Sequence, residues 1–183
     1  MAGSNRTALQ ANYEDTIKPE MQRKRGYKNA LQVPRLDKIV VNSGVGTGKD
    51  KEALQETIDT IALITGQKPV VTKARISVSN FKLRAGMDVG CRVTLRGGLM
   101  YNFLYRLINV VLPRVRDFRG IPVRGFDGAG NFNMGLPEQS MFPQIDLDKS
   151  KHTVGMNIAI ITTAQSDDEA KELLAMMGMP FTK

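Results

Sequence analysis

The chain has 183 residues, 42% of them hydrophobic and 24% charged, with a net charge of +8 and an isoelectric point near 9.7. These values are typical of a soluble globular protein with a real core, and they argue against disorder throughout the chain. No apolar run approaches the ~18 residues of a membrane span, residues 1–10 lack the apolar stretch of a secretion signal, and Cys91 has no cysteine to pair with. We expect one cytoplasmic domain over residues 1–183, with no membrane partner.

The positive charge is unevenly distributed. Residues 1–133 hold 22 basic and 11 acidic side chains, whereas residues 134–183 hold 4 and 7. Between positions 68 and 96, Asp88 is the only acid among seven basic residues: Lys68, Lys73, Arg75, Lys82, Arg84, Arg92 and Arg96. Clustered positive charge attracts a polyanion through phosphate neutralisation and counterion release. The alternative is that a basic surface only aids solubility.

The predicted elements begin with a helix over residues 7–25, whose apolar side chains recur every four positions and which Pro19 is expected to bend. Residues 35–45 are rich in β-branched side chains and predict a strand. Asp50 then provides an N-cap for a helix that Gly66 is expected to end.

The clearest pattern lies in residues 87–96, where apolar side chains alternate with polar or basic ones. This alternation predicts a half-buried strand with a basic outer face. Residues 69–75 are its expected partner. The eleven residues 76–86 between them are too many for a tight turn, and long loops of this kind are often functional. The sequence therefore predicts a long basic β-hairpin.

The remaining chain alternates regular and irregular segments. An apolar stripe over residues 99–111 predicts a helix, and the glycine- and proline-rich residues 114–148 predict a long irregular excursion. Residues 154–160 alternate as a strand. A capping box at residues 166–169 then begins a helix that Gly178 is expected to end.

The central order of elements is β-α-β-β-α-β, with a further helix at each end. This order indicates an α+β fold of the split βαβ, ferredoxin-like type, in which helices cover one face of an antiparallel sheet. The polar side chains of the 87–96 strand would then point to the open face. A basic, open sheet is a suitable platform for RNA.

A glycine-rich stretch at residues 42–50 suggests a phosphate loop, since it follows a strand and precedes a helix. Its spacing fails, because only three residues separate Gly44 from Gly48 and Asp50 replaces the expected hydroxyl. The dinucleotide-binding glycine pattern fails for the same reason. A phosphate-loop enzyme remains an alternative hypothesis.

The sequence also lacks the residue combinations that a zinc site or a catalytic nucleophile requires. One histidine, His152, and one cysteine, Cys91, cannot form a zinc site or a Cys-His pair, and we expect His152 to be an ordinary surface residue. The carboxylates at 167–169 suit a helix N-terminus. No base or cofactor motif accompanies the acids of the excursion: Asp127, Asp146 and Asp148. We therefore expect no enzyme, no metal and no cofactor.

The connection of the hairpin combines hydroxyls, an amide, an aromatic ring and two cations: Ser77, Ser79, Asn80, Phe81, Lys82 and Arg84. This set suits hydrogen bonds to 2′-hydroxyls and phosphates, with Phe81 free either to stack on a base or to fold onto the core. An RRM-type module shares the split βαβ plan. It is disfavoured because residues 35–45 and 87–96 carry no aromatic side chain.

Several blocks resemble the bacterial ribosomal large-subunit protein five family. They are GQKP at 66–69, TKA at 72–74, SVSNFKLR at 77–84, GCRVTLRG at 90–97, PRVRDFRG at 113–120, FDG at 126–128, GNF at 130–132, EQ at 138–139 and FP at 142–143. The resemblance extends over residues 7–183. Two positions depart from it: Ile76 and Pro137 stand where basic residues are expected.

The resemblance implies a structural protein of the large ribosomal subunit that binds 5S rRNA and helps attach it in the central protuberance. It implies further contacts with P-site tRNA, with neighbouring 23S rRNA, with other 5S rRNA-binding ribosomal proteins and, across an intersubunit bridge, with small-subunit protein thirteen.

The resemblance also implies roles for particular residues. The expected 5S rRNA contacts are Asn42, Gln67 and Thr94, with Lys68 and Arg92 nearby. The tip at 77–84 would face tRNA, and residues 114–148 would supply bridge or rRNA contacts. An RNA chaperone that does not reside on the ribosome is a third hypothesis.

Overall fold

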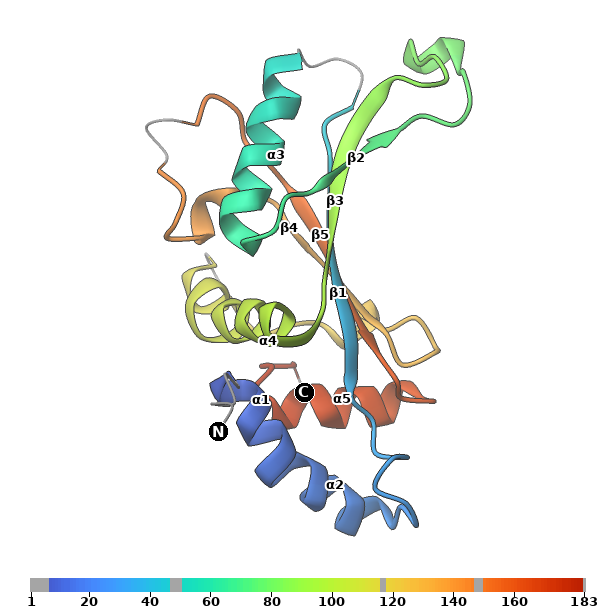
Figure 1. The fold of residues 1–183 in the computed structure, drawn as a ribbon, viewed down its shortest axis with the longest axis vertical. Helices are drawn as coiled ribbons and strands as arrows, with labels where there is room; N and C mark the ends of the chain where they lie inside the picture. The colour runs from blue at the N-terminus through green and yellow to red at the C-terminus, as the bar shows by residue number, and fades with distance from the viewer. Residues whose placement is uncertain (1–6, 47–50, 116–117, 147–149, 183) are drawn as a thin grey trace, which may run out of the picture. The chain divides into compact units, whose positions relative to one another are not determined.

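The computed structural model describes residues 7–46, 51–115, 118–146 and 150–182. Its strands form one five-stranded antiparallel sheet in the order β2-β3-β1-β5-β4 (Figure 1). The strands are β1 (Leu36–Gly44), β2 (Val70–Lys73), β3 (Asp88–Leu95), β4 (Phe132–Leu136) and β5 (Met156–Thr162). The helices are α1 (Ala8–Asn12), α2 (Lys18–Arg25), α3 (Lys51–Thr65), α4 (Gly97–Arg106) and α5 (Asp167–Met176). The predicted α+β class is confirmed.

The chain divides into two compact units. One is formed within residues 1–39, 96–133 and 159–183, and the other within 40–95 and 134–158. The first unit has a core of apolar side chains from its helices and strand ends: Tyr13, Met21, Phe103, Leu104, Phe132, Ile160 and Leu173. The second buries Val41, Ile61, Ile64, Cys91, Val93 and Ile158.

The predicted N-terminal helix contains both α-helical and π-helical turns. Thr7 caps α1 by accepting a hydrogen bond from the Gln10 N–H at 3.3 Å. The chain then continues as a π-helix over Tyr13–Ile17, and Pro19 lies in the first turn of α2. Because proline has no N–H to donate to the preceding turn, the ladder of hydrogen bonds is interrupted there, which accounts for the change of winding.

The ends of the later helices follow the sequence signals. Gly66 adopts φ +74° and donates its N–H to the Ala62 carbonyl at 2.8 Å, which ends α3 as predicted. Ser166 caps α5 by accepting from the Glu169 N–H at 3.4 Å. Glu169 completes the capping interaction on the N–H of Gln165, one residue earlier than the usual capping box. The predicted cap Asp50 lies outside the described residues.

The glycine-rich segment 114–148 was expected to be irregular throughout, and that prediction is wrong. It contains strand β4, and two of its turns are held by hydrogen bonds of the Asp127 and Gln139 side chains. The Gln139 side chain is buried, donates to the His152 carbonyl at 2.8 Å and accepts from the Val154 N–H. This part of the segment is therefore a packed structural element.

Within the first unit, the turn after Phe126 is also fixed. Asp127 accepts the N–H groups of Ala129 and Asn131, and Asp167 accepts those of Gly128 and Gly130 at 2.9–3.1 Å. The Asn131 side chain is the main cause that holds the pKa of Asp127 below its ordinary value, and the N–H groups of Ala129 and Asn131 act in the same direction. Asp127 therefore has a structural role.

None of the helices in the described ranges combines the length and apolar character that a bilayer crossing requires.

Candidate RNA-binding surface

The β1 and β3 strands present a polar face opposite a buried one. In β3, Cys91, Val93 and Leu95 are buried, whereas Arg92 is exposed and Thr94 half-buried. In β1, Val41 and Ser43 are buried and Asn42 is exposed. The predicted alternation of the strand is thus confirmed, and its polar side is open to a partner.

The register of the sheet brings the predicted contact residues near one another. The Val45 N–H donates to the Val89 carbonyl at 2.9 Å, and an antiparallel ladder continued from that contact places Asn42 opposite Arg92. On the other side of β3, Arg92 pairs with Val70, which is 66% exposed. The open face therefore combines polar side chains of β1 and β3 with an apolar side chain of β2.

Gln67 and Lys68 reach this surface from the turn after α3. The buried Thr65 hydroxyl donates to the Ile61 carbonyl at 2.7 Å and lies 3.1 Å from the Gln67 carbonyl. Pro69 is also buried, so the backbone of the turn is fixed while the side chains of Gln67 and Lys68 are exposed. Extending the Val70 pairing by two residues puts Lys68 at the level of Thr94.

A glycine allows β1 and β3 to approach closely. A Cβ atom on Gly90 would lie 2.3 Å from the Ser43 carbonyl oxygen. The Ser43 hydroxyl in turn donates to the Gly155 carbonyl at 2.6 Å, so Ser43 is held from the β5 side as well. The polar face of the sheet therefore depends on a backbone contact that only glycine permits.

Arg96 does not extend the free basic surface. Its guanidinium lies 3.0 Å from the Asp37 carboxylate, and Asp37 also lies 3.9 Å from Lys38. The cationic charge of Arg96 is partly neutralised within the protein. Arg92 is thus the exposed β3 cation without a carboxylate partner among the described residues.

The β2–β3 pair ends in a tip that extends beyond the two strands (Figure 1). The tip is stabilised by its own hydrogen bonds. A bridge joins Val78 to Leu83 around a 3-10 turn, Ser79–Phe81, and Lys82 takes the left-handed conformation with φ +51°. The Ser77 hydroxyl accepts from the Ala85 N–H at 2.9 Å. The loop thus has a defined conformation.

The side chains of the tip point outward. Phe81 is 70% exposed, so it does not fold onto the core. The polar and basic side chains around it are exposed as well: Ser77, Ser79, Asn80, Lys82 and Arg84. Met87, predicted on the apolar face, precedes β3 and is 40% exposed, and its sulfur accepts from the Arg84 N–H at 3.2 Å. The apolar face of β3 therefore starts later than predicted.

Sequence reasoning missed two features of the open surface. Gly135 of β4 and the exposed Asn157 of β5 line a shallow depression together with Asn42. A Cβ on Gly135 would lie 3.4 Å from the Asn157 Oδ1 atom. No local pattern marks these residues, because the strand pairing that gathers them is long-range.

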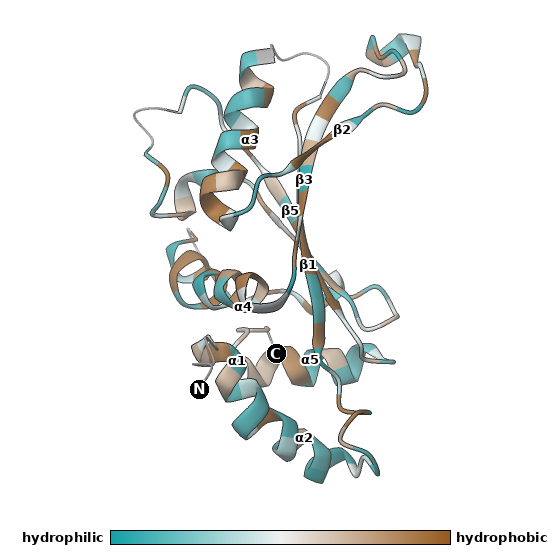
Figure 2. Ribbon diagram, viewed as in Figure 1, coloured by the Kyte–Doolittle hydropathy of each residue, from teal (hydrophilic) through white to brown (hydrophobic). Residues whose placement is uncertain are grey.

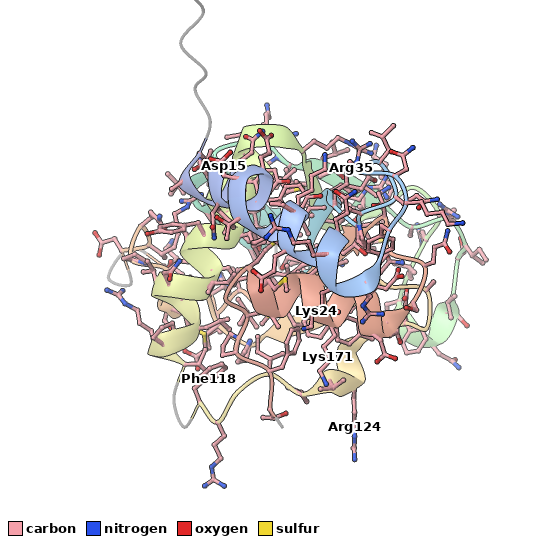
Figure 3. The ribbon with its side chains drawn as sticks, turned by 90° about the horizontal axis from the view of Figure 1, so that it is seen from below. Asp15, Lys24, Arg35, Phe118, Arg124 and Lys171 are labelled. Atoms are coloured by element: carbon pink, nitrogen blue, oxygen red, sulfur yellow. The ribbon has the colours of Figure 1, made fainter. Side chains whose placement is uncertain are left out.

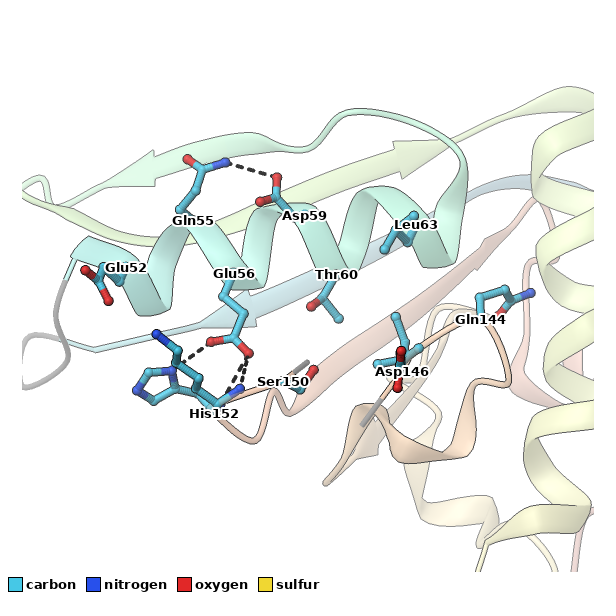
Figure 4. A pocket seen from close by; sticks show the side chains of 12 residues that line it. Glu52, Gln55, Glu56, Asp59, Thr60, Leu63, Gln144, Asp146, Ser150 and His152 are labelled. Atoms are coloured by element: carbon cyan, nitrogen blue, oxygen red, sulfur yellow. Dashed lines mark hydrogen bonds and ion pairs between the residues drawn. The ribbon is translucent and has the colours of Figure 1, made fainter. Parts of the chain in front are cut away.

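His152 is more than the ordinary surface histidine predicted. Its Nδ1 atom lies 2.8 Å from the Glu56 carboxylate, which also accepts the N–H groups of Lys151 and His152 (Figure 4). Glu56 therefore attaches residues 151–152 to α3. The His152 side chain and these N–H groups lower the pKa of Glu56. Across the described ranges, no group of three or more His, Cys, Asp and Glu side chains could hold a metal ion.

Glu56→Ala is expected to lower the free energy of unfolding by about 1–3 kcal/mol, since it removes a charged acceptor of three hydrogen bonds. Because the pKa of Glu56 is lowered in the folded protein, its contribution is present above the ordinary value of 4.5 and is lost as the pH falls below it. Urea unfolding between pH 7 and pH 3 measures this. Gln55→Ala, which removes a bond to Asp59 alone, is the control. An equal loss in both variants would contradict the role of Glu56.

The chemistry of Cys91 agrees with a structural position. Its side chain is fully buried, and burial raises the pKa of the thiol to about 11. The thiolate that a nucleophile requires is therefore disfavoured.

Comparison with known proteins identifies the family. Residues 29–84 match the model of ribosomal protein L5, and residues 88–181 match the model of the C-terminus of the same ribosomal family. The chain is 56% identical to large ribosomal subunit protein uL5 of Thermosipho africanus, over 96% of this chain and 97% of that protein. The proteins of the same name from Lactobacillus acidophilus and Kosmotoga olearia are 51% and 53% identical, each over 96% of this chain and over 98% and 96% of their own length. The resemblance inferred from the sequence blocks is confirmed: the chain belongs to the ribosomal protein L5 family, whose members are ribosomal proteins and not enzymes.

Proposed function

We propose that this protein is a structural component of the large ribosomal subunit that binds 5S rRNA and helps attach it in the central protuberance. The observation that carries the proposal is the polar face formed by Asn42, Arg92 and Thr94. An amide, a guanidinium and a hydroxyl can bind phosphates, 2′-hydroxyls and base edges together. Gln67 and Lys68 extend this set. The names of the relatives place those proteins in the large subunit.

The order of the strands supports the proposed ferredoxin-like plan. Without the edge strand β4, the order is β2-β3-β1-β5. This is the order of a split βαβ fold, with α3 and α4 as the two crossover helices. We propose on this basis that residues 1–183 act as one RNA-binding domain, with the β2–β3 arm as its basic hairpin.

The tip has the chemistry for a second RNA partner, which we assign to P-site tRNA. Phe81 supplies an exposed ring for stacking, and Lys82 and Arg84 supply charges for phosphates. Its internal hydrogen bonds reduce the entropy that binding would otherwise cost.

Residues 114–148 are the proposed source of contacts with 23S rRNA and, across the subunit interface, with small-subunit protein thirteen. Arg114, Arg119 and Arg124 are exposed in this segment. Other 5S rRNA-binding ribosomal proteins are expected as neighbours in a cytoplasmic ribonucleoprotein.

The proposal predicts selective and salt-dependent binding to 5S rRNA. Each phosphate neutralised by a cation contributes about 0.9 to the slope of log K against log salt concentration for a duplex. Filter binding between 50 and 300 mM KCl measures the slope. Equal affinity for an unrelated RNA of the same length would contradict the proposal. If the protein fails to sediment with large subunits at high salt, a free RNA chaperone becomes the better account.

The double variant Lys82→Ala/Arg84→Ala separates the two RNA surfaces. We expect its affinity for 5S rRNA to stay within a factor of about two of the wild type, because both residues lie in the tip and not on the β1–β3 face. Occupancy of the P site by tRNA should fall on subunits that carry the variant. A tenfold loss of 5S rRNA affinity would show that the assignment of the tip is wrong.

A further inference from the structure

The connection between α2 and β1 carries a second concentration of positive charge. Residues 22–36 contain no acid and five cations: Arg23, Lys24, Arg25, Lys28 and Arg35. Helix α2 is predominantly hydrophilic along its length (Figure 2). This segment belongs to the first compact unit, whereas Asn42, Arg92 and Thr94 belong to the other.

The segment is firmly attached at its N-terminal side. Gly26 ends α2 in the left-handed conformation and donates to the Gln22 carbonyl at 3.0 Å. The Arg25 guanidinium lies 2.7 Å from the Glu172 carboxylate of α5, and the Tyr27 hydroxyl donates to Glu169 at 2.8 Å. Figure 3 shows α2 beside α5, with Lys24 close to that helix.

The C-terminal side of the segment is also held by burial and by hydrogen bonds. Val33 and Pro34 are buried, and the Tyr13 hydroxyl donates to the Pro34 carbonyl at 2.9 Å. The Arg35 backbone exchanges hydrogen bonds with Thr163, its N–H donating to the threonine hydroxyl at 3.0 Å and its carbonyl accepting the threonine N–H at 2.9 Å. Residues 28–32 therefore connect two segments of the chain that are each held by hydrogen bonds.

Those middle residues form a turn that exposes an apolar side chain. Asn29 accepts the Leu31 N–H on its side-chain oxygen at 2.9 Å and the Gln32 N–H on its carbonyl at 3.0 Å. Leu31 is 84% exposed, and Lys28, Asn29 and Gln32 are exposed around it. Single exposed leucines are common on protein surfaces. Leu31 differs in that it lies in a turn held by hydrogen bonds and in a segment rich in cations, so it can contact a partner together with them. We name residues 26–35 the 26–35 arch.

The free charges of the segment point to a polyanion. Lys24 and Arg25 both bind Glu172, and they lower the pKa of that carboxyl group, Lys24 most strongly. Arg23, Lys28 and Arg35 have no carboxylate partner within the described residues. Three cations of the segment therefore remain available to a polyanion.

We propose that the 26–35 arch docks into the minor groove of an rRNA helix of the large subunit. The minor groove of A-form RNA is wide and shallow, so a protruding turn can enter it. Leu31 would lie against the riboses, the amides of Asn29 and Gln32 would face 2′-hydroxyls, and the flanking cations would bind phosphates on the groove edges. This inference rests on the proposed residence in the large subunit, but it assigns a contact separate from the 5S rRNA face.

Directed probing from Leu31 tests the contact. Leu31→Cys is labelled with tethered Fe(II)-EDTA in the full-length chain, and because Cys91 is fully buried, the new thiol is the accessible one. After incorporation into large subunits, we expect strong cleavage on both strands of one rRNA helix. The control is Leu63→Cys on α3, a leucine that is 62% exposed and belongs to the other unit. No rRNA cleavage from position 31, or the same cleavage from position 63, overturns the inference. A chain that does not enter the subunits at all overturns the proposed function as well.

Charge removal provides a second test. Arg23→Gln/Lys28→Gln should reduce the salt slope for binding to large-subunit cores depleted of this protein by about two, while leaving 5S rRNA binding unchanged. The control Asn12→Asp/Asn102→Asp lowers the net charge by the same amount at exposed sites of α1 and α4. An unchanged slope, or an equal change in the control, overturns the inference.

Discussion

Gly90→Ala is expected to lower the free energy of unfolding by about 3 kcal/mol. The new methyl group would lie 2.3 Å from the Ser43 carbonyl oxygen and 3.1 Å from the Gly44 Cα, and both are backbone atoms of β1. Relief requires β1 and β3 to separate, which breaks the sheet at the polar face. Urea denaturation at neutral pH measures the loss.

The matched control is Gly44→Ala in the neighbouring strand. A Cβ at that position meets nothing within 4 Å, so the change in stability should stay within about 0.5 kcal/mol. Because Gly90→Ala moves the strands that carry Asn42 and Thr94, it should also weaken 5S rRNA binding. If both variants are equally stable, the close approach of β1 and β3 is not the constraint that keeps glycine at position 90.

Asn42→Ala is expected to weaken 5S rRNA binding by about 1–3 kcal/mol, or roughly 5- to 150-fold. The amide lies exposed on the polar face opposite Arg92, so its loss leaves RNA groups without a partner in the complex. Thr94→Ala should have a similar effect, and Thr94→Ser should restore binding because the hydroxyl is retained. Filter binding at fixed salt concentration measures both.

Asn133→Ala is the control for these variants. Asn133 is an exposed asparagine on β4 that belongs to the other compact unit, so its removal should change 5S rRNA affinity by less than about twofold. The assignment of the polar face is wrong if Asn133→Ala and Asn42→Ala weaken binding equally.

Local signals in the sequence predicted the elements that depend on local physics. The alternation of β3 follows from one buried and one open face, and it placed Arg92 and Thr94 correctly. Gly66 ends α3 because a left-handed residue without a Cβ is required there. The Ser166 cap follows from the unpaired N–H groups of a helix start.

Long-range partners explain what the sequence could not predict. β4 is short and contains a glycine, and it forms a strand because β5 offers an edge to pair with. Asp167 was assigned to the helix dipole, yet it also binds the N–H groups of Gly128 and Gly130, 37 or more residues away. The bond between Glu56 and His152 spans 96 residues. No periodicity carries such information.

The candidate 5S rRNA contacts were predicted from family resemblance, and the fold brings these positions, which are distant in the sequence, onto neighbouring elements. Asn42 lies on β1, Thr94 on β3, and Gln67 in the turn before β2. Their grouping depends on strand order, which the sequence indicated only through the β-α-β-β-α-β succession. The amide and hydroxyl groups alone would not have distinguished them from other polar surface residues.

The most direct measurement is a hydroxyl-radical footprint of the full-length protein on 5S rRNA, made with the wild type, Asn42→Ala/Thr94→Ala and Lys82→Ala/Arg84→Ala. We predict one compact set of protected nucleotides that the first double variant loses and the second retains. Protection that is absent in the wild type, or that depends on Lys82 and Arg84 and not on Asn42 and Thr94, would contradict 5S rRNA binding by the β1–β3 face.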